Sequence, residues 1–207
     1  DKAAAPINLY GATKLCADKL FSSANNLKGK SQLTFSIVRY GNVIGSRGSV
    51  IPFFLNKKSS GVLPITHENM TRFNISLDEG VDMVLWALDN TDGGEIFVPK
   101  IPSYKILDVA EAVAPECKHE IIGIRPGEKL HEEMITTSDG PNTVDLGKYY
   151  AILPSYKINH IEKYIEEFGG QKVPNNFSYN SGANESFLSV EEIRKLIIEH
   201  VDPNFTI

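Results

Sequence analysis

The chain has 207 residues, a hydrophobic content of 42% and a formal net charge of −5 at pH 7. This length predicts about one domain, or one and a half, and the composition is typical of a globular protein with a hydrophobic core. The negative charge and the scattered basic residues argue against nucleic acid or an anionic membrane as the main partner. Because there is no signal peptide and no apolar run of about 18 residues, we expect a cytoplasmic protein.

The first expected helix covers residues 10–27 and carries a tyrosine and a lysine on one face. Tyr10 and Lys14 are four residues apart, so the phenol and the ammonium can point at the same spot. A nearby cation favours the phenolate form, which makes Tyr10 a candidate base toward an alcohol. The pair alone is a weak signal, because any amphipathic helix can place a solvated lysine beside a packed tyrosine.

A β-branched run predicts a buried strand at residues 33–38, and a polar segment follows it. Asn42 stands where this strand ends. In an open α/β sheet ligands bind at the carboxyl ends of the strands, so this position is a candidate for ligand contact. Residues 49–64 are then expected to leave the sheet for a substrate lobe, with a short helix around 51–55.

The rest of the chain alternates between strand and helix patterns. Ser76 with Glu79 and Ser189 with Glu192 are capping-box patterns that predict two helix starts. The apolar stripes expected on these helices are Leu77, Val81, Val84, Leu85 and Leu88, and Val190, Ile193, Leu196, Ile197 and Val201. The other expected elements are strands at 95–98, 120–124 and 149–153, helices at 106–113, 127–135 and 159–168, and a polar loop over 171–187. This alternation predicts an α/β fold with mainly parallel pairing.

Four stretches form a specific set: Asp1–Lys14, Arg39–Pro52, Met70–Phe73 and Gly123–Glu132. Together they resemble the extended short-chain dehydrogenase/reductase superfamily. Within it the chain is similar to the inverting UDP-N-acetylglucosamine 4,6-dehydratases of pseudaminic-acid and capsule polysaccharide biosynthesis. The resemblance covers nearly all of the chain and implies the C-terminal part of a Rossmann-like fold plus a smaller substrate-binding lobe.

The resemblance also implies a domain organisation. Residues 1–48 and about 71–100 would be the remainder of the nucleotide-binding domain, and residues 49–70 and 101–207 the UDP-sugar lobe with the C-terminal helices. No Gly-x-Gly-x-x-Gly turn follows a strand in this sequence, although such a turn brings a dinucleotide pyrophosphate to a helix N-terminus. Since the family carries its fingerprint upstream of the Asp-Lys pair, we expect a C-terminal portion of a longer polypeptide, inactive alone.

The reaction implied by the resemblance is an NADP-dependent dehydration of UDP-N-acetylglucosamine with inversion at C5. It needs a base for the C4 hydroxyl, a base for the C5 proton and an acid for the C6 oxygen. The resemblance assigns these roles to Tyr10, Lys2 and Asp1, in that order. Without the resemblance, Asp1 and Lys2 would be interpreted as two solvated charges.

Cofactor and substrate contacts follow from the same resemblance. The residues implied for NADP are Tyr10, Lys14, Asn42 and Val43, and those for the UDP-sugar are Asn42, Arg47, Arg72, Arg125 and Glu128. Guanidinium groups bind phosphate bidentately. Arg125 is the strongest candidate, because an expected helix start after it would add backbone N–H groups. Glu128 is expected to accept ribose hydroxyls, or alternatively to be a first-turn glutamate stabilised by the helix dipole.

Two other functions share parts of these patterns. A UDP-sugar 4-epimerase also uses Tyr-x-x-x-Lys, but it needs neither a C5 base nor a C6 acid, so the Asp1–Lys2 pair argues against it. A non-catalytic half-Rossmann module would serve subunit association only. A homo-oligomer is expected. No metal is expected, because the His131-Glu132 pattern has Ile135 where a zincin has its second histidine, and Cys16 and Cys117 match no ligand spacing.

Overall fold

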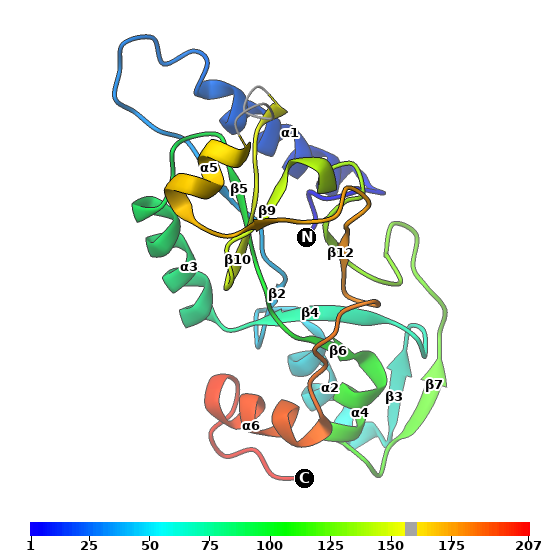
Figure 1. Cartoon of the computed structure of the whole chain (residues 1–207). Helices are drawn as coiled ribbons and strands as arrows, with labels where there is room; N and C mark the ends of the chain where they lie inside the picture. The colour runs from blue at the N-terminus through cyan, green and yellow to red at the C-terminus, as the bar shows by residue number, and fades with distance from the viewer. Residues whose placement is uncertain (156–160) are drawn as a thin grey trace. The chain divides into compact units, whose positions relative to one another are not determined.

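The computed structural model describes residues 1–155 and 161–207, and the chain groups into two compact units. Unit 1 is made of residues 1–40, 79–100 and 133–180, and unit 2 of residues 41–78, 101–132 and 181–207. Both units combine helices with small sheets, so the fold is mixed α/β (Figure 1). The assignment of nucleotide-binding and substrate-binding roles to parts of the chain stays a prediction.

Unit 1 is built on a five-stranded sheet in the order β1-β5-β10-β9-β11. Its strands are β1 (Ile37–Val38), β5 (Ile96–Pro99), β9 (Thr143–Asp145), β10 (Tyr149–Ile152) and β11 (Gln171–Lys172). Its helices are α1 (Leu9–Ala24), most of α3 (Leu77–Asp89), the 3-10 helix η2 (Gly140–Asn142) and α5 (Ile161–Phe168), and a small sheet pairs β8 (Glu133–Ile135) with β12 (Tyr179–Asn180).

Strand pairing differs from the mainly parallel arrangement that the sequence predicts. Among the described strands, three pairs are parallel and five are antiparallel. In unit 1, β1 runs parallel to β5, whereas β10 returns antiparallel to both β5 and β9. The connection from β9 to β10 is a tight turn at Gly147, whose φ is 88°; a short turn of this kind permits only antiparallel neighbours.

The core of unit 1 forms where α3 meets the sheet. Trp86 packs on Tyr149, with ring centroids 4.3 Å apart, and edge-on to Phe97 at 5.1 Å. Met83 and Ala87 are buried beside them. Trp86 is therefore a packing residue of the core of unit 1.

The apolar stripe expected on α3 lies at the surface instead of in the core. Leu77, Val81, Val84, Leu85 and Leu88 are between 41% and 68% exposed. The helix turns its other face, with Met83 and Ala87, toward the sheet. Met83 and Ala87 therefore form the buried face of α3, although the opposite stripe is more hydrophobic.

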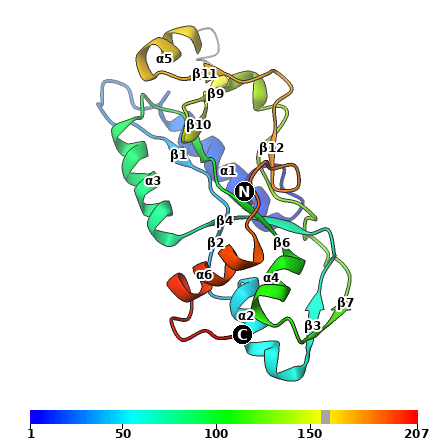
Figure 2. The same ribbon diagram turned by 60° about the horizontal axis from the view of Figure 1, so that its bottom comes forward.

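Unit 2 contains two small sheets, three α-helices and one 3-10 helix. Its strands are β2 (Asn42–Val43), β3 (Val62–Ile65), β4 (Thr71–Ile75), β6 (Ser103–Lys105) and β7 (Lys118–Ile121). Its helices are α2 (Val50–Lys57), the 3-10 helix η1 (Lys58–Ser60), α4 (Ile106–Val113) and α6 (Val190–His200). The sheets have the order β2-β4-β6 and β3-β7, and β3 and β7 lie side by side as a parallel pair (Figure 2).

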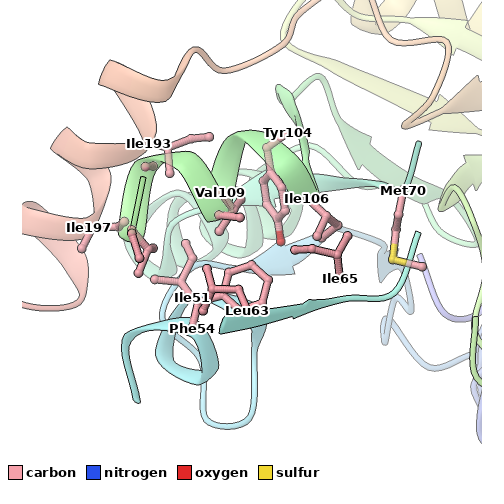
Figure 3. Packing of buried hydrophobic residues seen from close by; sticks show 14 of the residues in the cluster. Ile51, Phe54, Leu63, Ile65, Met70, Tyr104, Ile106, Val109, Ile193 and Ile197 are labelled. Carbon is pink, nitrogen blue, oxygen red and sulfur yellow. The ribbon is translucent and has the colours of Figure 1, made fainter. Parts of the chain in front are cut away.

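The core of unit 2 joins segments that are far apart in the sequence. Phe54 from α2, Leu63 from β3 and Val109 from α4 are almost completely buried, and Ile193 and Ile197 of α6 complete the cluster (Figure 3). Burial of side chains of this size stabilises a fold by about 1.5–3 kcal/mol each relative to exposure. The last helix of the chain is thus part of the core that supports unit 2.

The helix predicted at residues 127–135 is wrong. Residues 122–132 form turns and extended backbone, and residues 133–135 form β8. Pro126 and Gly127 make a tight turn, with Gly127 at φ 78° and the Glu128 N–H donating to the Arg125 carbonyl at 3.0 Å. The Leu130 carbonyl then accepts from the Thr71 N–H of β4 at 3.1 Å, so pairing with a strand replaces helical bonds.

Smaller differences concern the C-terminal third of the chain. The helix predicted at 159–168 is observed as α5 from Ile161, and residues 159–160 lie outside the described residues. The predicted loop at 171–187 contains two short strands, β11 and β12. The capping box of α6 is confirmed, because Ser189 and Glu192 make both reciprocal bonds.

Candidate functional site

The Asp1–Lys2 segment packs against helix α1. The Lys2 ammonium donates to the Asp1 carboxylate at 2.8 Å, and the Asp1 backbone nitrogen donates to the Tyr40 carbonyl at 2.9 Å. The Asp1 side chain is buried, whereas that of Lys2 is 43% exposed. A Cβ placed at Gly11 of α1 would lie 2.7 Å from the Lys2 carbonyl oxygen. The segment can approach the helix this closely only because residue 11 is glycine.

Tyr10 and Lys14 share one face of α1, as their spacing predicts. The Lys14 Nζ lies 5.4 Å from the centroid of the Tyr10 ring, and Tyr10 is 61% exposed. Asn8 caps the helix by accepting from the Gly11 N–H at 2.8 Å, which fixes the first turn where Tyr10 stands. The exposed phenol is available to a ligand, and its catalytic role stays a prediction.

Unit 2 holds a polar cavity of about 260 Å³. Asn42, Arg72, Arg125 and Glu128, four of the residues predicted to bind cofactor or substrate, line it together. They come from β2, from β4 and from the turn at residues 125–128. Its apolar wall is formed by Val50, Phe53, Phe54, Pro64, Met70 and Ile106. The arrangement combines two guanidinium groups, a carboxylate and an amide with an apolar surface.

Two buried polar atoms of this cavity have no hydrogen-bond partner among residues 1–155 and 161–207. They are Oδ1 of Asn42 and Oγ of Ser49. Ser49 is the N-cap residue of α2, yet its hydroxyl makes no capping bond. A buried polar group without a partner costs about 1–3 kcal/mol. A polar ligand in the cavity would remove this cost only where it reaches one of these two atoms.

Sequence reasoning missed Ser49 and Tyr104 as cavity residues. A serine before an apolar helical run is typical of a plain N-cap, so the local pattern gives no separate signal for a cavity residue. Tyr104 comes from β6 and is 4% exposed. Burial raises its pKa to about 12, the Arg72 charge acts in the opposite direction, and Glu132 adds to the increase. Tyr104 thus stays a neutral phenol that can donate a hydrogen bond.

Two other predicted residues of unit 2, Arg47 and Val43, are not among the residues that line the cavity, although Val43 lies next to Asn42 in β2. The Arg125 side chain lines the cavity, and its backbone N–H donates to the Glu128 carboxylate at 3.5 Å. Since no helix begins at residue 127, the added anion site expected beside Arg125 is absent, and so is the alternative role of Glu128 in a first helical turn.

A buried arginine in unit 1 also escaped prediction as an organising residue. Arg39 donates to the Asp18 carboxylate at 2.8 Å and to the Met134 carbonyl at 2.7 Å, and both charged side chains are largely buried. This pair joins α1, β1 and β8. It holds the helix that carries Tyr10 to the sheet of its unit.

Neither a metal cluster nor a membrane helix is found in the part of the chain that the structure describes. Across residues 1–155 and 161–207, no three His, Cys, Asp or Glu side chains are grouped as metal ligands. Within the same residues, the helices are too short or too polar to cross a bilayer. His131 instead bonds to Thr71, with its Nδ1 2.8 Å from the threonine Oγ1.

Comparisons with known proteins add a family and several relatives. Residues 1–154 match the model of a family described as polysaccharide biosynthesis protein. The chain is 53% identical over 203 residues to the UDP-N-acetylglucosamine 4,6-dehydratase (inverting) of Campylobacter jejuni, covering 95% of this chain and 61% of that protein. It is 37% identical over 204 residues to the UDP-glucose 4-epimerase of Rickettsia akari, covering 96% and 59%.

A solved structure supports the same grouping. The chain superposes on the X-ray structure of Pen from Bacillus thuringiensis with a TM-score of 0.80 and 35% sequence identity, covering 96% of this chain and 59% of that one. In each comparison the chain spans about three fifths of the relative's length.

Proposed function

Because this chain belongs to the polysaccharide biosynthesis protein family, we propose that it carries catalytic and substrate-binding residues of an NADP-dependent UDP-N-acetylglucosamine 4,6-dehydratase that inverts C5. Its fold would be the C-terminal part of a Rossmann-like, extended short-chain dehydrogenase/reductase fold with a smaller substrate lobe. The observation that carries the proposal is the Asp1–Lys2 ion pair, packed at Gly11 against the helix that presents Tyr10. The Campylobacter jejuni relative bears the name of this activity.

The ion pair suits an elimination that needs a base and an acid together. Lys2 and Asp1 are 2.8 Å apart, a distance at which one proton can pass between them. Its passage to Asp1 leaves a neutral amine and a carboxylic acid. The amine then takes the C5 proton while the acid protonates the leaving C6 oxygen, so that water departs and the ion pair returns. Reprotonation of C5 from the opposite face of the sugar inverts that centre.

Tyr10 would remove the C4 hydroxyl proton. The exposed phenol and the nearby ammonium fit a nicotinamide nucleotide, because Lys14 can donate a hydrogen bond to a hydroxyl of its ribose. A nicotinamide bound beside Tyr10 and Lys14 would supply the hydride chemistry of the reaction between C4 and C6. Asn42 and Val43 are the further candidates for cofactor contact.

The cavity of unit 2 is the proposed site for UDP. Arg125 would bind the diphosphate, Glu128 would accept the ribose hydroxyls, and the unpartnered oxygens of Asn42 and Ser49 would be satisfied by polar groups of the nucleotide sugar. Arg47 and Arg72 are the other candidates for phosphate. The cavity volume of about 260 Å³ accommodates part of a nucleotide sugar, with the remainder outside it.

Solvent isotope incorporation tests the proposed reaction. The full-length gene product is incubated with UDP-N-acetylglucosamine in D₂O, and deuterium at C5 of the product is measured by NMR. A dehydratase with C5 inversion must introduce solvent deuterium at C5 with inverted configuration. Lys2→Met removes the amine, so water loss should fall while C4 oxidation persists.

The same experiment separates the alternatives. A UDP-sugar 4-epimerase, the activity named for the Rickettsia akari relative, transfers hydride only at C4 and leaves C5 unlabelled. A non-catalytic association module consumes no nucleotide sugar. Unlabelled C5 in the wild type would refute the dehydratase proposal. Full labelling in Lys2→Met would transfer the role of C5 base to another residue.

A further inference from the structure

We infer that His131 is a positioning residue: in its neutral form it closes a chain of hydrogen bonds that holds the segment at residues 125–132 to strand β4. Through this chain His131 sets two cavity residues of the segment, Arg125 and Glu128, against Arg72 of β4. The inference rests on the proposed function for the identity of the nucleotide. It deepens that proposal by making the affinity for the nucleotide depend on pH.

The chain of hydrogen bonds starts at a backbone amide and runs through three side chains. The Glu132 N–H donates to Ser181 Oγ at 2.9 Å, and Ser181 Oγ lies 2.7 Å from Thr71 Oγ1. Thr71 Oγ1 in turn lies 2.8 Å from Nδ1 of His131. Ser181 and Thr71 are both buried. The chain therefore joins β4, the segment at residues 125–132 and the backbone at residue 181 within unit 2.

The backbone amide fixes the direction of these bonds. A backbone N–H can only donate, so Ser181 Oγ accepts from Glu132, and the Ser181 proton goes to one of two oxygens. These are Thr71 Oγ1 at 2.7 Å and the Thr71 carbonyl at 3.3 Å, and only the first distance lies in the usual range of an O–H···O bond. Thr71 Oγ1 then gives its own proton to His131. Nδ1 of His131 is thus an acceptor, and the neutral ring carries its proton on Nε2.

The His131 ring is held in place by the backbone that passes beside it. A Cβ at Gly182 would lie 2.6 Å from Nδ1 and 2.7 Å from Cγ of the ring, so the backbone approaches this closely only because residue 182 is glycine. The Thr71 N–H also donates to the Leu130 carbonyl at 3.1 Å, directly before His131 in the chain. Residues 122–132 are turns and extended backbone, so contacts of this kind decide where the segment lies.

Protonation of His131 reverses the chain of hydrogen bonds. A proton on Nδ1 makes the ring a donor, so Thr71 Oγ1 passes its proton to Ser181 instead. Ser181 is then left with the Thr71 carbonyl, at 3.3 Å, as the acceptor for its own proton. That carbonyl already accepts from Arg72 Nη1 at 2.7 Å. The reversed chain is therefore weaker, and it holds the segment less firmly against β4.

The surroundings of His131 keep the ring neutral at pH 7.5. Burial lowers its pKa from 6.5, and the charges of Arg72 in β4 and of His67 before this strand lower it further. On the same segment, the Glu132 carboxylate lies between Arg72 and Lys129, at 3.8 Å and 3.5 Å from their nitrogens. The serine and the glycine at residues 181–182 bring no titratable group. The ring therefore becomes charged only below pH 6.5.

Binding of the β-methyl ester of UDP at two pH values tests the inference on the full-length gene product. This probe has no sugar to react and no phosphate that titrates between pH 5 and pH 8. By calorimetry, the wild-type affinity should fall about two- to tenfold from pH 7.5 to pH 5.0, as expected for the loss of one hydrogen bond. His131→Asn places an amide oxygen near the position of Nδ1, which accepts but does not titrate. This variant should keep the affinity at pH 7.5 and lose most of the fall; an equal fall would overturn the inference.

Two further variants separate the acceptor from the ring and from its neighbour. His131→Phe keeps a ring beside Gly182 without the acceptor, so its affinity should be low at both pH values; wild-type affinity at pH 7.5 would contradict the inference. If His131→Phe does not fold, the comparison of the wild type with His131→Asn decides alone. His67→Gln is the matched control, because His67 accepts only from the nearby Asn69 N–H, at 3.0 Å, among the bonds of the described residues. This control should keep the wild-type fall, and its loss would assign the titration to His67.

NMR of the ring nitrogens makes the result independent of the proposed function. The nucleotide-free, full-length protein is labelled with ¹⁵N-histidine, and the His131 signals are assigned by their loss in His131→Asn. At pH 7.5 they should show a proton on Nε2 and none on Nδ1. A proton on Nδ1 would refute the chain of hydrogen bonds. Failure of the wild type to bind the methyl ester at either pH would instead refute the nucleotide site, and the nitrogen signals would still decide the role of His131 in the chain.

Discussion

The close approach of the Asp1–Lys2 segment to α1 leads to a prediction for Gly11→Ala. The added Cβ would lie 2.7 Å from the Lys2 carbonyl oxygen and 2.9 Å from Cβ of Pro6, so the segment must move to reach ordinary contact at 3.4 Å or more. Overpacking of this kind costs about 1–3 kcal/mol. Alanine in a helix recovers about 1 kcal/mol relative to glycine, so the net loss of stability should be small.

Activity should respond much more strongly than stability to Gly11→Ala. A misplacement of about 1 Å in a reacting group can cost about 10²-fold in rate. In the full-length gene product, turnover of UDP-N-acetylglucosamine should therefore fall by about 10- to 100-fold, while the midpoint of thermal unfolding changes little. Both are measured on the same preparation, by product formation and by calorimetry.

Gly80→Ala in α3 is the matched control, because a Cβ at Gly80 meets nothing within 4 Å. This variant should keep the wild-type turnover and gain up to about 1 kcal/mol of stability from helix propensity. Wild-type turnover in Gly11→Ala would refute the reasoning, since it would mean that the position of the Asp1–Lys2 segment against the helix does not matter to the reaction.

Three further predictions concern single sites. Tyr10→Phe should lower C4 oxidation by about 10²–10⁴-fold with UDP affinity unchanged; a loss of UDP affinity at an unchanged rate would make Tyr10 a binding residue. Arg39→Met leaves the buried Asp18 carboxylate uncompensated, so the free energy of unfolding measured by chemical denaturation should fall by about 3–5 kcal/mol. Adding Asp18→Leu to this variant should restore much of the lost stability. Equal stability of the single and the double variant would contradict this prediction. The pKa of His131 is lowered from 6.5, first by burial and then by the Arg72 charge. The unfolded state therefore binds more protons than the folded state below pH 6.5, and the free energy of unfolding should fall as the pH drops from there. In His131→Gln the free energy of unfolding should depend less steeply on pH, and an unchanged slope would contradict the assignment.

Local sequence signals predicted those elements whose formation depends on neighbouring residues. The capping box of α6 forms as expected, because Ser189 and Glu192 satisfy each other's helix-start groups within four residues. Helix α2 lies where the apolar run after Ser49 predicts it. The set of motifs also identified Asn42, Arg72, Arg125 and Glu128, which line one cavity.

The errors arise where a distant segment competes for the same groups. Residues 127–135 have a helical pattern, but the Leu130 carbonyl is bound by Thr71 and Arg72 from β4, nearly 60 residues earlier. No local pattern contains that information. For α3, hydrophobicity favours one face, whereas the shape of the aromatic cluster around Trp86 favours the other. The role of Gly11 depends on a backbone nine residues before it and is likewise invisible to helix periodicity.

The interleaving of the two units has a consequence for synthesis of the protein on the ribosome. The chain passes from one unit to the other five times, and α6, the last helix of unit 2, supplies Ile193 and Ile197 to its core. At about 5–20 residues per second, unit 2 stays without this part of its core for several seconds after α2 has emerged. During that interval its apolar surface is exposed to chaperones and to other nascent chains. Loss of α6 should therefore first appear as a lower yield of folded protein in the cell.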